Sequence, residues 1–129
     1  MRKIIISIFL VLTFLRSTAM CEMAADWFNE AHTLSDGKKY TDPINAVEYL
    51  NNAIKLQPNY AETYYNRGVA YDKLGQYQRA IEDYNQAFRL NPDYAKAYNN
   101  RGINYLSQGN KKIGCFDAQK ACIFETANC

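Results

Sequence analysis

Few side chains in this chain of 129 residues have the type and setting that catalysis needs. His32 is the single histidine, and no serine or cysteine stands in the strained turn that a nucleophilic triad uses. The acidic pair Glu82-Asp83 falls on a predicted helix, where adjacent side chains point about 100° apart. We therefore interpret Glu82-Asp83 as part of a solvated face, and we predict that the chain is not an enzyme.

The cysteines have a spacing that favours a structural role. Cys115, Cys122 and Cys129 are seven residues apart, without the close Cys or His neighbours of a metal or haem site. Within one helix, Cys115 and Cys122 have Cα atoms about 10 Å apart, and a disulfide needs roughly 4.4–6.8 Å. Cys129 follows the predicted helix end, so we predict a Cys122–Cys129 disulfide, which leaves Cys21 and Cys115 over. We expect no metal and no cofactor.

The N-terminal segment has the three parts of a secretory signal peptide: a basic start, an apolar run at 4–15 and small residues after it. Twelve helical residues reach about 18 Å, which is short of the roughly 30 Å hydrocarbon core. We predict that residues 1–19 are removed after Ala19, with Cys21 or Ala25 as later cleavage candidates. The alternatives are an uncleaved anchor, a buried helix, or a lipid anchor on Cys21.

Removal of this leader changes the charge balance. It deletes Arg2, Lys3 and Arg16, so the basic residues fall from 15 to 12 against 13 acidic ones, a net charge near −1. No basic excess is then left to bind nucleic acid. We expect an exported protein, periplasmic or secreted, with no membrane span in the mature chain.

The rest of the chain repeats itself with a period of 34 residues. Residues 60–71 and 94–105 are identical at seven of twelve aligned positions, and residues 46–60 align with 80–94 at the same offset. Two separate segments that give one period indicate an internal repeat.

Each period contains the parts of a helical hairpin. Gly68 and Gly102 lie inside helices, where glycine costs about 1 kcal/mol relative to alanine, so we expect another element to pack closely there. We expect Gly75 to adopt the left-handed backbone conformation in the turn between the two helices. Pro58 and Pro92 end the second helix of a unit.

This pattern resembles the tetratricopeptide repeat (TPR) family, carried in the middle unit by Tyr64, Gly68, Tyr71, Ala80, Tyr84, Ala87 and Pro92. Arg67 and Arg101 stand where the family has leucine, and we expect their stems to cover neighbours while their heads reach water or a carboxylate. The resemblance implies an all-α fold, a helix-turn-helix solenoid of about three repeats in a right-handed superhelix.

We predict units at 24–60, 61–94 and 95–128. The first is irregular, because three extra residues lengthen its turn before Pro43, where Asp42 is a plausible helix cap. The third has Gly114 in place of alanine and lacks the polar capping helix that usually closes a solenoid. We expect its last face to be covered by a partner or a second copy, or the chain to be shortened there.

The resemblance implies a concave groove lined by the first helix of each unit. Its predicted residues are Phe28, His32, Glu62, Tyr65, Asn66, Val69, Lys96, Asn99, Asn100 and Ile103, with Asp72 and Leu106 on the same face. Asn66 and Asn100 either bind a peptide backbone or satisfy groups within the repeat. The scarcity of basic residues argues against a clamp for a terminal carboxylate, and the aromatic residues favour an apolar or aromatic segment.

Two functions remain in view. The chain is expected to be a non-catalytic adaptor or scaffold that presents this groove to a protein or peptide partner. The alternative is a self-assembling structural piece, a homo-oligomer that docks through its uncapped C-terminal repeat.

Overall fold

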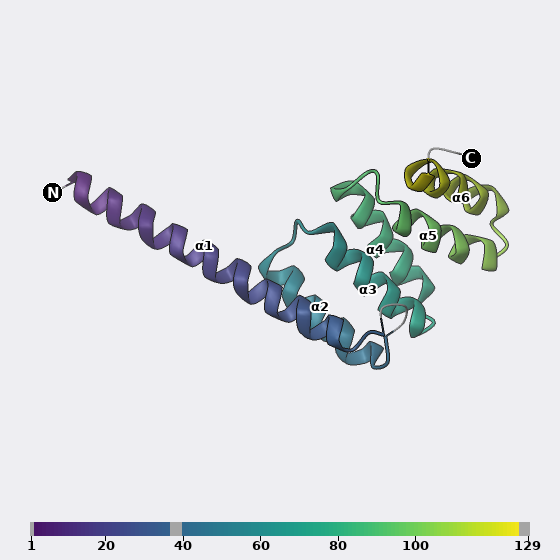
Figure 1. Ribbon diagram of the computed structural model, residues 1–129, viewed down its shortest axis with the longest axis horizontal. Helices are drawn as coiled ribbons and strands as arrows, with labels where there is room; N and C mark the ends of the chain where they lie inside the picture. Colours follow the sequence, from purple (N-terminus) through teal and green to yellow (C-terminus); the bar gives the residue numbers. More distant parts are fainter. Residues whose placement is uncertain (1, 37–39, 127–129) are drawn as a thin grey trace.

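The computed structural model describes residues 2–36 and 40–126, and shows helical hairpins standing side by side along the long axis of the molecule (Figure 1). The helices are α1 (Arg2–Thr33), α2 (Pro43–Leu56), α3 (Ala61–Lys73), α4 (Tyr77–Leu90), α5 (Ala95–Ser107) and α6 (Lys111–Thr126). The pairs α1–α2, α3–α4 and α5–α6 form the three hairpins. The all-α solenoid expected from the sequence is confirmed.

The helix ends follow the local residue types. The side chain of Asp42 accepts a hydrogen bond from the backbone N–H of Asn45, and Pro43 opens α2, so the predicted cap is confirmed. Gly75 has a φ of 72°, the left-handed conformation expected in the turn between α3 and α4. α2 and α4 each end two residues before a proline, as predicted.

The core of the middle hairpin forms where small residues meet large ones. A Cβ atom on Gly68 would lie 2.6 Å from Cε1 of the Tyr84 ring, too close for any side chain. Tyr84 is fully buried together with Ala80 and Ala87 of α4. The glycine inside α3 therefore exists because the tyrosine ring of α4 lies directly against its backbone.

The first hairpin has the longer turn that the sequence predicts. Ser35 and Tyr40 pair in a single antiparallel bridge, and the Thr41 N–H donates to the Leu34 carbonyl across the turn. Tyr40 is buried in the cluster around Ala31. The turn therefore closes the first hairpin with a core residue of its own.

The N-terminal half of α1 projects away from the hairpins (Figure 1). Leu12 and Leu15 are more than half exposed there, whereas Ala24 and Ala31 further along the same helix are buried. Among the residues that the structure describes, no helix is both long and apolar enough to cross a membrane.

Candidate functional site

Arg67 of α3 forms hydrogen bonds with side chains of two other helices. Arg67 donates from Nε and Nη2 to the two carboxylate oxygens of Asp83 on α4, over 2.8 and 2.6 Å, and from Nη1 to Asn51 on α2 over 2.7 Å. The expectation of a solvated Asp83 is wrong, because this carboxylate is buried and bidentately paired. Arg67 does reach a carboxylate, as its replacement of the family's leucine led us to expect.

The same arrangement recurs one period later. Arg101 of α5 donates to both carboxylate oxygens of Asp117 on α6, over 2.7 and 2.6 Å, and to Asn85 of α4. Each of the three residues lies 34 positions after its counterpart in the preceding unit. The Arg–Asp pair thus joins the two helices of a unit, and the asparagine joins that unit to the one before it.

The first helices of the second and third units share a polar network. Asp72 accepts hydrogen bonds from the Tyr84 hydroxyl and from the Asn104 amide, the latter over 2.6 Å. Asn100 donates to the Tyr65 hydroxyl over 3.4 Å. The hydrogen bond of Asn100 therefore goes to the preceding repeat, and not to a group of its own repeat as one of the two interpretations expected.

Burial changes the acid strength of this network. It raises the pKa of Asp72 above its ordinary value, although the hydrogen bonds from Tyr84 and Asn104 act in the opposite direction. Burial also raises the pKa of Tyr65, and it raises that of Tyr40 to about 12. Both phenols therefore stay neutral up to a higher pH than an exposed tyrosine does.

Aromatic pairs form at the starts of α3 and α5, where Tyr60 and Tyr94 are the N-cap residues. The Tyr65 ring packs on Tyr94 with centroids 5.1 Å apart, and the Phe28 ring meets Tyr60 at 5.7 Å. The Tyr60 hydroxyl donates to Glu62 over 2.8 Å. Phe28 and Tyr60 line a cavity of about 270 Å³ between α1, α2 and the start of α3.

The predicted groove residues differ in how far they reach solvent. Tyr65, Val69 and Asn100 are half-buried and pack or bond within the fold. The residues left exposed are His32, Lys96, Asn99 and Ile103, and those partly covered are Phe28, Glu62 and Asn66. Any ligand of this face would meet the exposed residues first.

The cysteines are only partly accounted for. Cys21 and Cys115 are exposed free thiols. Cys129 lies outside the described residues, so the Cys122–Cys129 disulfide stays a prediction. Within the described part of the chain, no group of three or more His, Cys, Asp or Glu side chains is placed to hold a metal ion.

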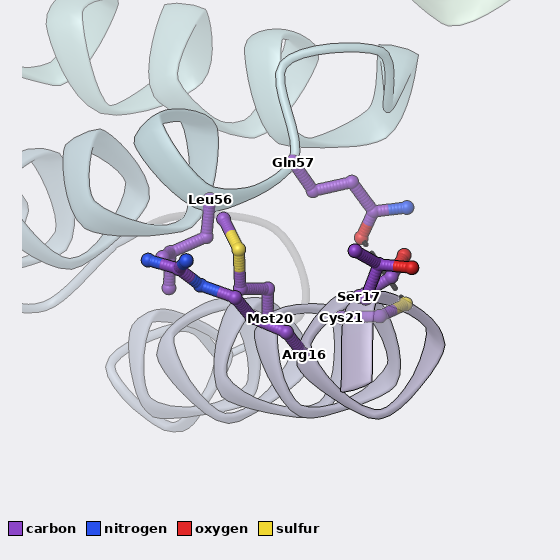
Figure 2. Close-up of a pocket in the computed structure, with 7 residues that line it drawn as sticks. Arg16, Ser17, Met20, Cys21, Leu56 and Gln57 are labelled. Carbon is purple, nitrogen blue, oxygen red and sulfur yellow. Dashed lines mark hydrogen bonds between the residues drawn. The ribbon is translucent and has the colours of Figure 1, made fainter. Parts of the chain in front are cut away.

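A second cavity, of about 410 Å³, lies between α1 and the end of α2 (Figure 2). Cys21 donates from Sγ to the Gln57 side-chain oxygen across it, over 3.9 Å. Thr13, Arg16 and Ser17 form one of its walls. A cut after Ala19 would remove that wall, so this cavity is a poor candidate for a site of the processed chain.

Two protein-family models match this chain. The Tetratricopeptide repeat model matches residues 61–94, and the TPR repeat model matches residues 45–75. The chain is a TPR protein. Among curated proteins, no sequence matches it significantly.

Solved TPR structures have the same architecture. The Arabidopsis OM64 TPR domain is 27% identical, with a TM-score of 0.78 over 84% of this chain and 88% of that one. A crystal structure of MamA is 30% identical, with a TM-score of 0.63, and covers 66% of this chain. The chain spans about half the length of the MamA structures that it matches. The first TPR of Spaghetti (RPAP3), bound to the HSP90 peptide SRMEEVD, is 21% identical with a TM-score of 0.76, and supports the fold alone.

Sequence reasoning missed the asparagines and aspartates that the two arginines bind. A signal was present, since Asn51 and Asp83 both recur at an offset of 34. It was overlooked because partners 16 residues apart on three helices share no helical face. Asn104 has no such signal, since the residue one period earlier is Ala70.

Proposed function

We propose that this TPR protein is an exported, non-catalytic adaptor whose groove along α1, α3 and α5 binds a segment of a protein or peptide partner. The observation that carries this proposal is the exposed row Lys96, Asn99 and Ile103 on α5, beside half-buried Tyr65. These exposed side chains offer amide and apolar contacts to a ligand. The hydrogen bonds of Asp72 with Tyr84 and Asn104 hold the helices beneath them in place. A rigid helical surface with exposed side chains suits recognition of an extended segment.

The composition of this face favours an apolar or aromatic segment. Ile103 is 55% exposed, and the rings of Tyr65 and Tyr94 pack on each other between α3 and the start of α5. The side chains of Glu62 and Lys96 carry opposite charges, so this face as a whole does not favour an acidic ligand. Aromatic and aliphatic anchors carry a disproportionate share of binding energy at such surfaces.

Export is supported by the leader pattern and by the apolar side chains that the fold leaves uncovered. Leu12 and Leu15 have little packing against the hairpins, being 59% and 57% exposed. A segment that the folded domain does not cover is suited to removal during export.

A selection from a displayed peptide library against the purified chain tests the groove. The test variant is Asn99→Ala with Ile103→Ser, which changes two exposed residues of α5 and leaves the buried network intact. The matched control is Glu82→Ala with Arg89→Ala, two exposed residues of α4. Selected peptides should lose affinity by at least about tenfold for the groove variant and bind the control normally. Equal binding to both variants would overturn the proposal.

A further inference from the structure

The contact between consecutive units is built the same way twice. Arg67 of α3 donates to Asn51 of α2, and Arg101 of α5 donates to Asn85 of α4. At the second boundary an aromatic stack accompanies the hydrogen bond, with the Phe88 and Tyr98 ring centroids 4.2 Å apart. This repetition indicates which positions of one unit face the next.

The equivalent positions in the first unit hold different residues. α1 aligns with α3 at an offset of 37, which pairs Trp27 with Tyr64, so Glu30 takes the place of the arginine. Tyr49 of α2 takes the place of Asp83 and Asp117. The side of α1 that would face a preceding unit therefore carries a carboxylate in place of the Arg–Asp pair.

These residues line an open cavity of about 350 Å³. Its walls are Met23, Asp26, Trp27 and Glu30 of α1 and Tyr49 of α2. The Trp27 and Tyr49 rings lie 5.6 Å apart, and Met23 is 52% exposed. The first unit thus ends in an apolar hollow with two carboxylates at its rim.

The opposite end of the solenoid has a complementary surface. Gln119 of α6 occupies the position of Asn51 and Asn85, and Phe116 and Ile123 lie about one turn on either side of it. Phe116 is 54% and Ile123 is 47% exposed. In α4 the corresponding residues are the charged Glu82 and Arg89, so the solvated face of the middle unit is apolar in the last one.

The two ends also differ in charge. Between residues 20 and 33, α1 carries acidic side chains and no lysine or arginine; its acids are Glu22, Asp26 and Glu30. α6 carries lysines, at Lys111, Lys112 and Lys120, and one of its two acids, Asp117, is neutralised by Arg101. Opposite charge at two ends favours their association and disfavours the pairing of like ends.

We propose that the α6 end of one copy stacks onto the α1 end of the next copy. The Gln119 amide then faces the Glu30 carboxylate, as Asn85 faces Arg101 within the chain, but with the amide as donor. Phe116 and Ile123 lie beside this contact, because their counterparts Glu82 and Arg89 stay exposed where α5 packs on α4, and the lysines of α6 lie near the acids of α1. Because the two surfaces differ, the contact is heterologous, and an assembly that does not close into a ring keeps a free surface at each end.

Paired charge reversals in the full chain test this arrangement. The first variant, Asp26→Lys with Glu30→Lys, makes the α1 end basic; the second, Lys112→Glu with Lys120→Glu, makes the α6 end acidic. The control, Glu82→Lys with Asp93→Lys, makes the same charge change as the first variant at exposed positions of neither end. Sedimentation velocity measures association, and circular dichroism checks that each variant is folded.

The wild type and the control should associate, and each end variant alone should associate at least about tenfold more weakly. An equimolar mixture of the two end variants should regain association, because each then offers the other a surface of opposite charge. A wild type that stays monomeric up to millimolar concentration would overturn the proposal. So would an α1-end variant that still associates alone, since that result indicates pairing of α6 with α6, or a mixture that does not recover. The groove residues are unchanged throughout, so the outcome is independent of the proposed adaptor function.

Discussion

Gly102 and Gly114 face each other so closely that neither position accepts a side chain. A Cβ atom on Gly114 would lie 3.0 Å from the Gly102 carbonyl oxygen, and one on Gly102 would lie 3.1 Å from the Gly114 carbonyl oxygen. In the preceding unit, the position of Gly114 is the buried Ala80. The α5–α6 hairpin therefore packs with closer backbones than the repeat pattern alone suggests.

We expect Gly114→Ala to destabilise the protein, although alanine restores the residue of the repeat. The new Cβ would also lie 2.5 Å from Cγ of Leu106. Such overpacking costs about 1–3 kcal/mol, which exceeds the roughly 1 kcal/mol that alanine adds to helix stability. Urea unfolding measures the difference. Adding Leu106→Ala should recover only part of the loss, and a Gly114→Ala protein as stable as wild type would contradict this packing.

Loss of one member of the Arg101–Asp117 pair should lower the free energy of unfolding more than loss of both members. The Asp117 side chain is 0% exposed, so Arg101→Met leaves a buried carboxylate without its partner. Breaking a buried pair in this way costs about 3–5 kcal/mol. In a double-mutant cycle by urea unfolding, we expect Arg101→Met with Asp117→Leu to be more stable than Arg101→Met alone. Simple additivity of the two single changes would show that the two side chains are not coupled.

Stability should depend on pH through Asp72. Its pKa is raised in the folded state from an ordinary value near 3.8, so between that value and the raised one the folded protein binds more protons than the unfolded chain. The free energy of unfolding therefore falls as the pH rises through this window. Asp72→Asn cannot titrate. Relative to that variant, wild type should lose stability as the pH rises from about 4 through the raised pKa. Urea unfolding at a series of pH values measures this, and parallel pH profiles would rule it out.

Processing of the N-terminus is directly measurable. When the chain is produced in its own host, intact mass and N-terminal sequencing should show a chain that begins at Met20. The reason is the small residue Ala19 after the apolar run. Ala19→Leu should block or shift the cut, and Thr18→Ser serves as the conservative control. A mature chain that retains Arg2 and Lys3 would indicate an anchor, and one whose first residue is a lipid-modified Cys21 would indicate a lipoprotein.

The helices and their hairpins were predictable from the sequence because local residue types decide them. Pro43, Pro58 and Gly75 mark boundaries through backbone geometry alone, and the period of 34 pairs the helices. The environment of Asp83 was not predictable in the same way. An adjacent acidic pair on a helix usually faces water, and only the approach of Arg67 from another helix makes burial of the carboxylate tolerable.

The groove was predictable as a surface but not as a network. A repeat offset identifies Tyr65 and Asn99 as equivalent positions, yet the first is packed among rings and the second is exposed. Which of them faces solvent depends on whether a following unit exists to cover it. That is a property of the stacked units and not of either helix.

The helix pairs that make substantial contact are neighbours along the chain, from α1·α2 to α5·α6. No hairpin needs a distant segment of sequence to complete its main packing surface. Contacts of such short range carry a small loop-closure cost and favour rapid folding. A chain built this way can fold progressively from its N-terminal end while the remainder is still emerging from a ribosome or a translocation pore. Under mechanical load it should yield one hairpin at a time.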